Sequence, residues 1–116
     1  MLTAHHVNAF LVIGVCMLAA LASFVAWRRQ RAGVAVTQLL ALAQTLIVAQ
    51  VALGLLLLSK HHRAAYHLHY AYGTFALLAV LSPWLYAPAE PRARLLWFAI
   101  ATLVAAALGV RAYLTA

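Results

Sequence analysis

Residues 7–27 read VNAFLVIGVCMLAALASFVAW and contain no charged side chain. About 20 apolar residues, at 1.5 Å rise per residue, form a helix that crosses the roughly 30 Å hydrocarbon layer of a bilayer. This stretch has the length and the composition for one such crossing. We therefore expect it to be a transmembrane helix.

Three further stretches meet or approach the same criterion, at residues 33–59, 67–86 and 95–113. The first of them is uncharged and longer than one crossing needs, so we expect it to tilt. Residues 67–86 carry histidine only at their start, and residues 95–113 carry only Arg111, near their end. The sequence predicts four spans in a single membrane domain, residues 1–116.

The overall composition supports lipid as the surrounding solvent. Hydrophobic residues make up 68% of the chain, which has eight Lys or Arg and the single acid Glu90. A soluble domain needs roughly a quarter of its residues charged. The formal charge of +7 does not predict nucleic-acid binding, because the basic residues are not spread along an exposed element. Cys16, the only cysteine, can form neither an intramolecular disulfide nor a thiolate metal cluster.

The links between the spans are residues 28–31, 60–66 and 87–94, all short enough to make successive helices antiparallel neighbours. The predicted fold is an all-α integral membrane bundle of four helices that run up, down, up and down. Its setting is expected to be a bacterial or archaeal plasma membrane.

The basic residues predict the orientation. The first and third links together carry Arg28, Arg29, Arg31, Arg92 and Arg94. The opposite side carries Lys60, Arg63 and Arg111. Since basic residues concentrate in cytoplasmic loops, we place the first link in the cytoplasm and both termini on the non-cytoplasmic side.

All six histidines fall close to the predicted outer surface; they are His5, His6, His61, His62, His67 and His69. Histidine inside a span tends to be a ligand, a proton relay or a hydrogen-bond partner. The pair in the 60–66 link is expected to be solvated. The histidines at the starts of the first and third spans are therefore the candidate ligands.

The first and third spans run in the same direction and are diagonal partners in an up-down bundle. Two imidazoles facing one another across a four-helix core suit a six-coordinate haem iron, whereas a bare Zn²⁺ or Cu²⁺ needs three or four converging ligands. We expect His6 and His69 to be the haem-iron ligands. His5 and His67 are second choices, because residues one or two apart on a helix cannot both point inward.

Other residues complete the expected cofactor site. Gly73, one turn after His69, would let a porphyrin approach the backbone. Arg63 and Arg111 could pair with haem propionates, with Lys60 a weaker candidate; Arg111 could equally be a snorkelling anchor. Three glutamines make the second span unusually polar, at positions 38, 44 and 50. Hydrogen bonding between helices is the default explanation for them, and a quinone contact is a weaker one.

Three short motifs follow one another along the first three predicted spans. A histidine opens a helix that ends in AWRR (26–29), the next helix contains QVALG (50–54) before a leucine run, and HLH (67–69) opens the third. Over roughly residues 5 to 85 this pattern resembles the haem-bearing half of the heme A synthase family. The resemblance implies a four-helix fold with a histidine at the outer start of two alternate helices, and it puts His6 and His69 in the ligand positions.

The chain departs from that family in two respects. It has neither a glutamate one turn before the first histidine nor a cysteine pair in an outer loop. Haem oxidation is therefore not expected. The segments HYAYG (69–73) and RAYLT (111–115) also resemble small uncharacterised four-helix membrane proteins of bacteria, which imply a fold but no activity.

The sequence thus favours a small membrane protein resembling a b-type cytochrome, with one haem b near the outer surface. It is expected to act in electron transport as a carrier or as an accessory subunit of a respiratory-chain assembly, rather than as a self-sufficient enzyme. Its partners would be lipid and either such an assembly or a second copy in a homodimer. The alternative is a non-redox structural or assembly subunit. A channel or transporter is less favoured, since the inner halves of the first, third and fourth spans are apolar.

Overall fold

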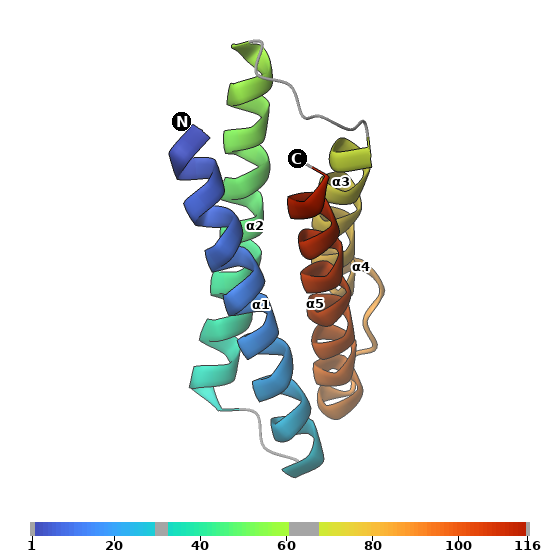
Figure 1. The fold of residues 1–116 in the computed structure, drawn as a ribbon. Coiled ribbons are helices and arrows are strands. Elements are labelled where there is room, and N and C mark those ends of the chain that lie inside the picture. The colour runs from blue at the N-terminus through green and yellow to red at the C-terminus, as the bar shows by residue number, and fades with distance from the viewer. Residues whose placement is uncertain (1, 30–32, 61–67, 116) are drawn as a thin grey trace.

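The computed structural model describes residues 2–29, 33–60 and 68–115. Within these ranges the chain is helical and has no strand (Figure 1). The helices are α1 (Leu2–Arg29), α2 (Val34–Ser59), α3 (Leu68–Leu81), the four-residue α4 (Pro83–Tyr86) and α5 (Pro91–Leu114). The all-α fold class is confirmed.

Three of the helices in the described part of the chain are long and apolar enough to cross a membrane. Their spanning segments are Thr3–Arg29, Val34–Ser59 and Pro91–Leu114. Their length and composition support the prediction of a transmembrane protein. The third predicted span instead appears as two pieces, α3 and α4, which meet at Ser82 and Pro83. Proline has no backbone N–H to donate, so it interrupts the helix and opens α4 at its first position.

Two helices begin earlier than the apolar stretches suggested. α1 starts at Leu2 rather than near residue 7, so His5 and His6 are part of the helix. α5 starts at Pro91 rather than at residue 95, because Glu90 caps it. The two carboxylate oxygens of Glu90 accept hydrogen bonds from the backbone N–H groups of Arg92 (3.0 Å) and Ala93 (2.6 Å). Capping chemistry, which apolar length does not report, decides where α5 begins.

The Glu90 cap makes a pH-dependent contribution to stability. The N–H groups of Ala93 and Arg92 stabilise the carboxylate and lower the pKa of Glu90. The cap is therefore complete above the unfolded-state pKa of about 4.3 and is lost as the pH falls through the lower pKa of the folded state. We expect Glu90→Ala to lower the thermal midpoint of the detergent-solubilised protein at neutral pH and to flatten its acid dependence, while Glu90→Asp retains both. Circular dichroism melts across the acid range measure this. Identical acid profiles for wild type and Glu90→Ala would contradict it.

The helices pack with α1 between α2 and α5, and with α3 mainly against α5 (Figure 1). Among the described residues α1 and α3 make no close backbone approach, so they face one another across the bundle. The starts of α1 and α3 and the ends of α2 and α5 lie at the same end of the molecule (Figure 1). This arrangement gathers four helix termini from distant parts of the sequence.

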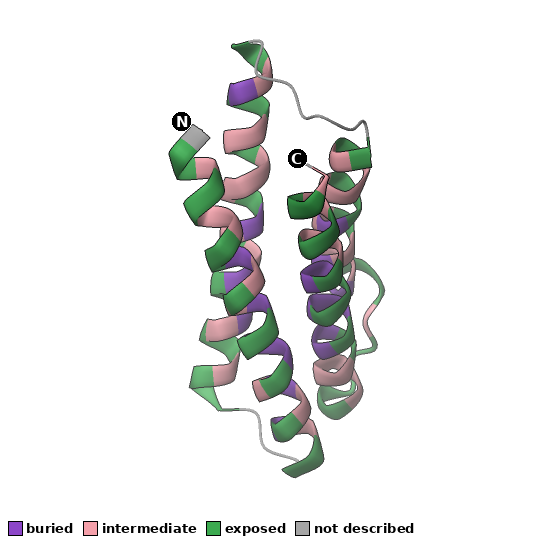
Figure 2. Ribbon diagram, in the orientation of Figure 1, coloured by how far each residue is buried: buried purple, intermediate pink, exposed green. Residues whose placement is uncertain are grey.

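The core is made of small side chains. The α1 and α5 helices bury a set of them completely or nearly so: Cys16, Ala19, Ala20, Ala99, Ala105 and Ala106. Figure 2 shows the buried residues along the middle of the bundle. Small residues let helix backbones approach closely, which is the usual packing of membrane helices.

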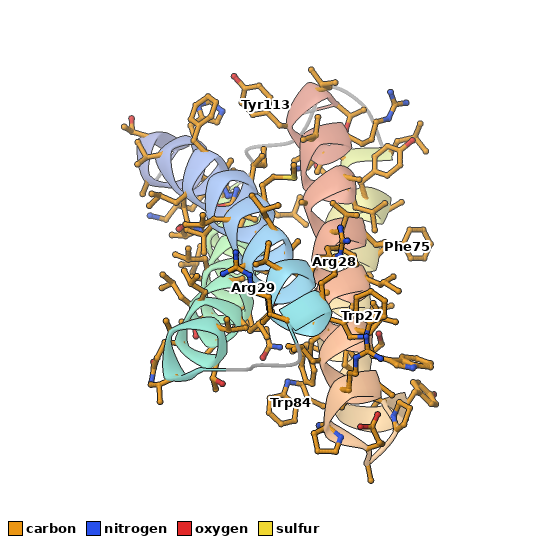
Figure 3. All side chains as sticks on the ribbon, turned by 90° about the horizontal axis from the view of Figure 1, so that it is seen from below. Trp27, Arg28, Arg29, Phe75, Trp84 and Tyr113 are labelled. Carbon is orange, nitrogen blue, oxygen red and sulfur yellow. The ribbon has the colours of Figure 1, made fainter. Side chains whose placement is uncertain are left out.

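Large apolar side chains lie on the outside instead. Leu21 is 63% exposed, Leu85 is 79% exposed and Phe75, which points away from the bundle in Figure 3, is 56% exposed. A water-soluble bundle would put such residues inside. This distribution fits a molecule whose outer surface contacts lipid.

Because α1 and α5 pack closely, added side-chain volume between them should lower the stability of the fold. Ala105 is fully buried, whereas Ala107 on the same helix is exposed. Ala105→Leu forces extra volume between the helices and is expected to cost about 1–3 kcal/mol, while Ala107→Leu should be close to neutral. Thermal melts of the two purified variants make the comparison. Equal destabilisation by both substitutions would contradict the packing described here.

Candidate functional site

The candidate site lies at one end of the bundle, which we call the histidine end. It is formed by the starts of α1 and α3 and the ends of α2 and α5, and it carries His5, His69, Lys60 and Arg111. His5 on α1 and His69 on α3 approach with 6.2 Å between ring centroids and 72° between ring planes. These two imidazoles come from helices that face one another across the bundle. The meeting of a first-span and a third-span histidine at one depth is what the sequence suggested.

The structure brings His5, rather than His6, to that meeting point. His6 is exposed, whereas His5 is partly buried and lies on the same face of α1 as Asn8, Val12 and Cys16. Successive residues on a helix lie about 100° apart, so only one of two adjacent histidines can face the core. The geometry therefore reverses the order of preference between the two.

The ring of His69 is oriented by the last turn of α5. Its Nδ1 lies 2.6 Å from the backbone carbonyl oxygen of Ala112. Because a carbonyl can only accept, Nδ1 carries the proton and donates it, which leaves the lone pair on Nε2. A metal-binding histidine usually donates its other ring N–H to a carboxylate, a backbone carbonyl or water, and this bond fixes the orientation of the ring.

His5 is held by a polar network between α1 and α2. Gln50 Nε2 donates to the His5 backbone oxygen at 3.0 Å and lies 3.4 Å from His5 Nε2. Asn8 Nδ2 in turn donates to Gln50 Oε1 at 2.9 Å and to the Leu46 backbone oxygen at 3.0 Å. The network sets both the depth and the rotation of α1, because it joins two of its turns to α2.

One nitrogen of His5 is left without a partner. His5 Nδ1 is buried and makes no hydrogen bond in the described structure. A buried polar atom without a partner costs free energy, so a ligand that engages it would be favoured. The same ring packs against Gly54, where a Cβ atom would come within 3.3 Å of His5 Cε1. Gly54 therefore leaves room for the imidazole.

Of the other residues predicted for the site, the structure describes Gly73 and Arg111. A Cβ atom at Gly73 would meet nothing within 4 Å, so open space lies beside that backbone. The Arg111 guanidinium lies 5.6 Å from the centroid of the Tyr72 ring, at the same end of the bundle. Arg63 and His67 lie outside the described residues. Of the glutamines, Gln44 accepts a hydrogen bond from Trp84 Nε1 at 2.9 Å, and Gln38 is exposed.

Asn8, Gly54 and Ala112 were not among the residues predicted for the site, and Gln50 was expected to make hydrogen bonds between helices, as it does with α1. One signal for Asn8 was present in the sequence. Residues 5, 8, 12, 16, 19 and 23 follow a helical repeat of polar and small side chains that marks the inward face of α1. The role of Ala112 depends on its backbone carbonyl, which no side-chain pattern reports.

In the described ranges the candidate ligands are two imidazoles, those of His5 and His69. Among residues 2–29, 33–60 and 68–115 no group of three or more His, Cys, Asp or Glu side chains could hold a metal ion. A tetrahedral zinc site would need such a group, whereas a porphyrin supplies four ligands itself and takes only two from the protein.

Comparison with known proteins finds no matching family model, no matching curated protein and no matching solved structure. The resemblance to the heme A synthase family stays a hypothesis that depends on the quoted motifs. The described part of the chain defines the class of protein as all-helical, with three helices apolar enough to cross a membrane and a histidine pair near one end.

Proposed function

We propose that this protein binds one haem b between His5 and His69 and serves in electron transport, as a small b-type cytochrome or as a haem-bearing subunit of a respiratory-chain assembly. The carrying observation is the 6.2 Å separation of the two ring centroids. A metal–imidazole bond is about 2 Å long. Two such bonds, plus the distance from each coordinating nitrogen to the centre of its ring, come to roughly 6 Å.

The residues present suit the cofactor. His69 Nε2 has a free lone pair, and His5 has an unpartnered buried nitrogen. The open space beside Gly73 supports room for a macrocycle on the α3 side. When bound, haem would supply a one-electron change of its iron between the ferric and ferrous states.

The protein's own groups have distinct tasks in this proposal. The Ala112 carbonyl orients the His69 ring. Gln50 and Asn8 hold His5 at a fixed depth and rotation. Arg111, beside Tyr72 at the same end, provides a cation for a propionate. Most of these groups act by preorganising the two imidazoles.

The membrane topology belongs to the same proposal. α1, α2 and α5 would each cross the bilayer, and α3 with α4 would form the fourth crossing of an up-down-up-down bundle. The end that carries Arg28, Arg29, Arg92 and Arg94 would face the cytoplasm of a bacterial or archaeal cell, with both termini outside. A haem at the histidine end would then exchange electrons with a partner on the outer side.

The direct test is the absorption spectrum of the purified, reduced protein after haem supplementation. Sharp α and Soret bands are expected at one haem per chain. The rival function is a non-redox membrane subunit, in which the His69–Ala112 and Gln50–His5 bonds only hold helices together. Absence of the bands in a folded, supplemented protein would favour that rival.

A further inference from the structure

The opposite end of the bundle, which we call the arginine end, carries a concentration of unpaired positive charge. It consists of the end of α1 and the start of α5, with Arg28, Arg29, Arg92 and Arg94. Glu90 is the only acidic side chain in the whole sequence, and both of its oxygens are occupied by backbone N–H groups of α5. The described side chains of this end therefore carry three more positive than negative charges.

Two of the arginines are held in place by aromatic rings. The Arg92 guanidinium lies 4.7 Å from the centroid of Trp27, and its Nε donates to the Trp27 backbone oxygen at 3.3 Å. The Arg94 guanidinium lies 5.6 Å from the Trp84 ring and 5.4 Å from the Phe98 ring. The Arg92 contacts join α5 to α1, and the contact of Arg94 with Trp84 joins α5 to α4. A guanidinium stacked on an aromatic ring keeps its N–H donors free for an anion.

The other two arginines border a hollow. Arg28 and Arg29 are exposed and, with Val25, line a partly open depression of about 410 Å³. Figure 3 shows Trp27, Arg28 and Arg29 around the end of α1, with Trp84 also at this end. The depression thus has two cationic side chains and one apolar side chain, Val25, in its lining.

We propose that the arginine end binds the phosphate of anionic phospholipid headgroups. Trp27 and Trp84 are of the type that marks the level of the headgroups, where lipid phosphate is the abundant anion. Anionic lipids suit the site better than zwitterionic ones, because no headgroup ammonium offsets their phosphate. The inference depends on the membrane spans and is independent of haem binding.

The test is competition between lipids on the full chain. The purified protein is mixed with equal amounts of phosphatidylglycerol and phosphatidylcholine, and bound lipid is counted by native mass spectrometry. Wild type is expected to retain mainly phosphatidylglycerol. Arg28→Gln combined with Arg29→Gln should bind it roughly 10- to 30-fold more weakly, given about 1 kcal/mol for each arginine near a membrane surface.

The matched control removes the same charge from the other end. Lys60→Gln combined with Arg111→Gln should leave the preference for phosphatidylglycerol unchanged. Arg28→Lys with Arg29→Lys, which keeps the charge, should retain most of it, and circular dichroism checks that each variant is folded. Equal losses in the two glutamine variants would overturn the proposal, since charge alone would then explain binding. Displacement of the lipid by glycerol 3-phosphate at comparable concentration would also overturn it, in favour of a soluble phosphate as the ligand.

Discussion

His5→Ala and His69→Ala are each expected to abolish the sharp α band of the reduced, haem-supplemented protein, while His6→Ala leaves it intact. His5 and His69 meet across the bundle, whereas His6 is adjacent in sequence but exposed. Loss of outer-shell partners of a metal ligand costs about 10- to 100-fold in affinity, so loss of a ligand itself should weaken haem binding at least about 100-fold. The double variant should show no Soret band above that of free haem.

Absorption spectra and haem titrations of the four variants make this measurement. His6→Ala is the matched control, because it removes an imidazole from the same turn of the same helix. Added imidazole should restore part of the low-spin spectrum of His69→Ala by filling the vacated ligand position. Should His6→Ala lose the band while His5→Ala keeps it, the inward face of α1 described here would be wrong. Unchanged spectra in every variant would remove the haem site from this end.

Gln50→Leu is expected to lower stability and haem affinity together. Gln50 bonds to Asn8 and to the His5 backbone, so leucine removes two hydrogen bonds between α1 and α2. Such bonds contribute on average about 0.6 kcal/mol and at most about 1.7 kcal/mol each in a membrane protein. A loss of roughly 1–3 kcal/mol follows, and α1 becomes free to rotate His5 out of line with His69.

Gln38→Leu is the control on the same helix, since Gln38 is exposed. Thermal melts and haem titrations of both variants provide the comparison. A double-mutant cycle of Gln50→Leu with Asn8→Leu should be non-additive, because the two side chains share one bond. If Gln50→Leu loses stability but binds haem as wild type does, Gln50 holds the helices together without positioning His5.

At the histidine end, the sequence predicted the depth of the two histidines but not the direction in which their side chains point. The depth of His5 and of His69 could be obtained by counting residues along two apolar helices, because rise per residue is constant. The rotation of these two side chains about their helix axes could not be obtained by counting. The hydrogen bond between Asn8 and Gln50, which are 42 residues apart, turns α1 so that His5 faces inward. The backbone carbonyl of Ala112, 43 residues from His69, orients the His69 ring.

The arginine end shows a similar division. The sequence placed the arginine-rich links on one side of the membrane, as the bias of basic residues indicates. It did not indicate that Arg92 would lie over Trp27, or that Glu90 would cap α5 rather than pair with an arginine. The contact of Arg92 with Trp27 depends on how closely the end of α1 approaches the start of α5, whereas the Glu90 cap is local to the first turn of α5.

By itself the sequence determined that the chain is all-helical and has spans apolar enough for a membrane, because backbone hydrogen bonding within lipid leaves few alternatives to a helix and apolar length can be counted. The tertiary structure decided which histidine faces the core and which arginine lies over Trp27. These features depend on contacts between residues far apart in the chain, and the hydrophobic pattern of a membrane helix is nearly uniform around its axis. Only packing against neighbouring helices distinguishes one face of such a helix from another.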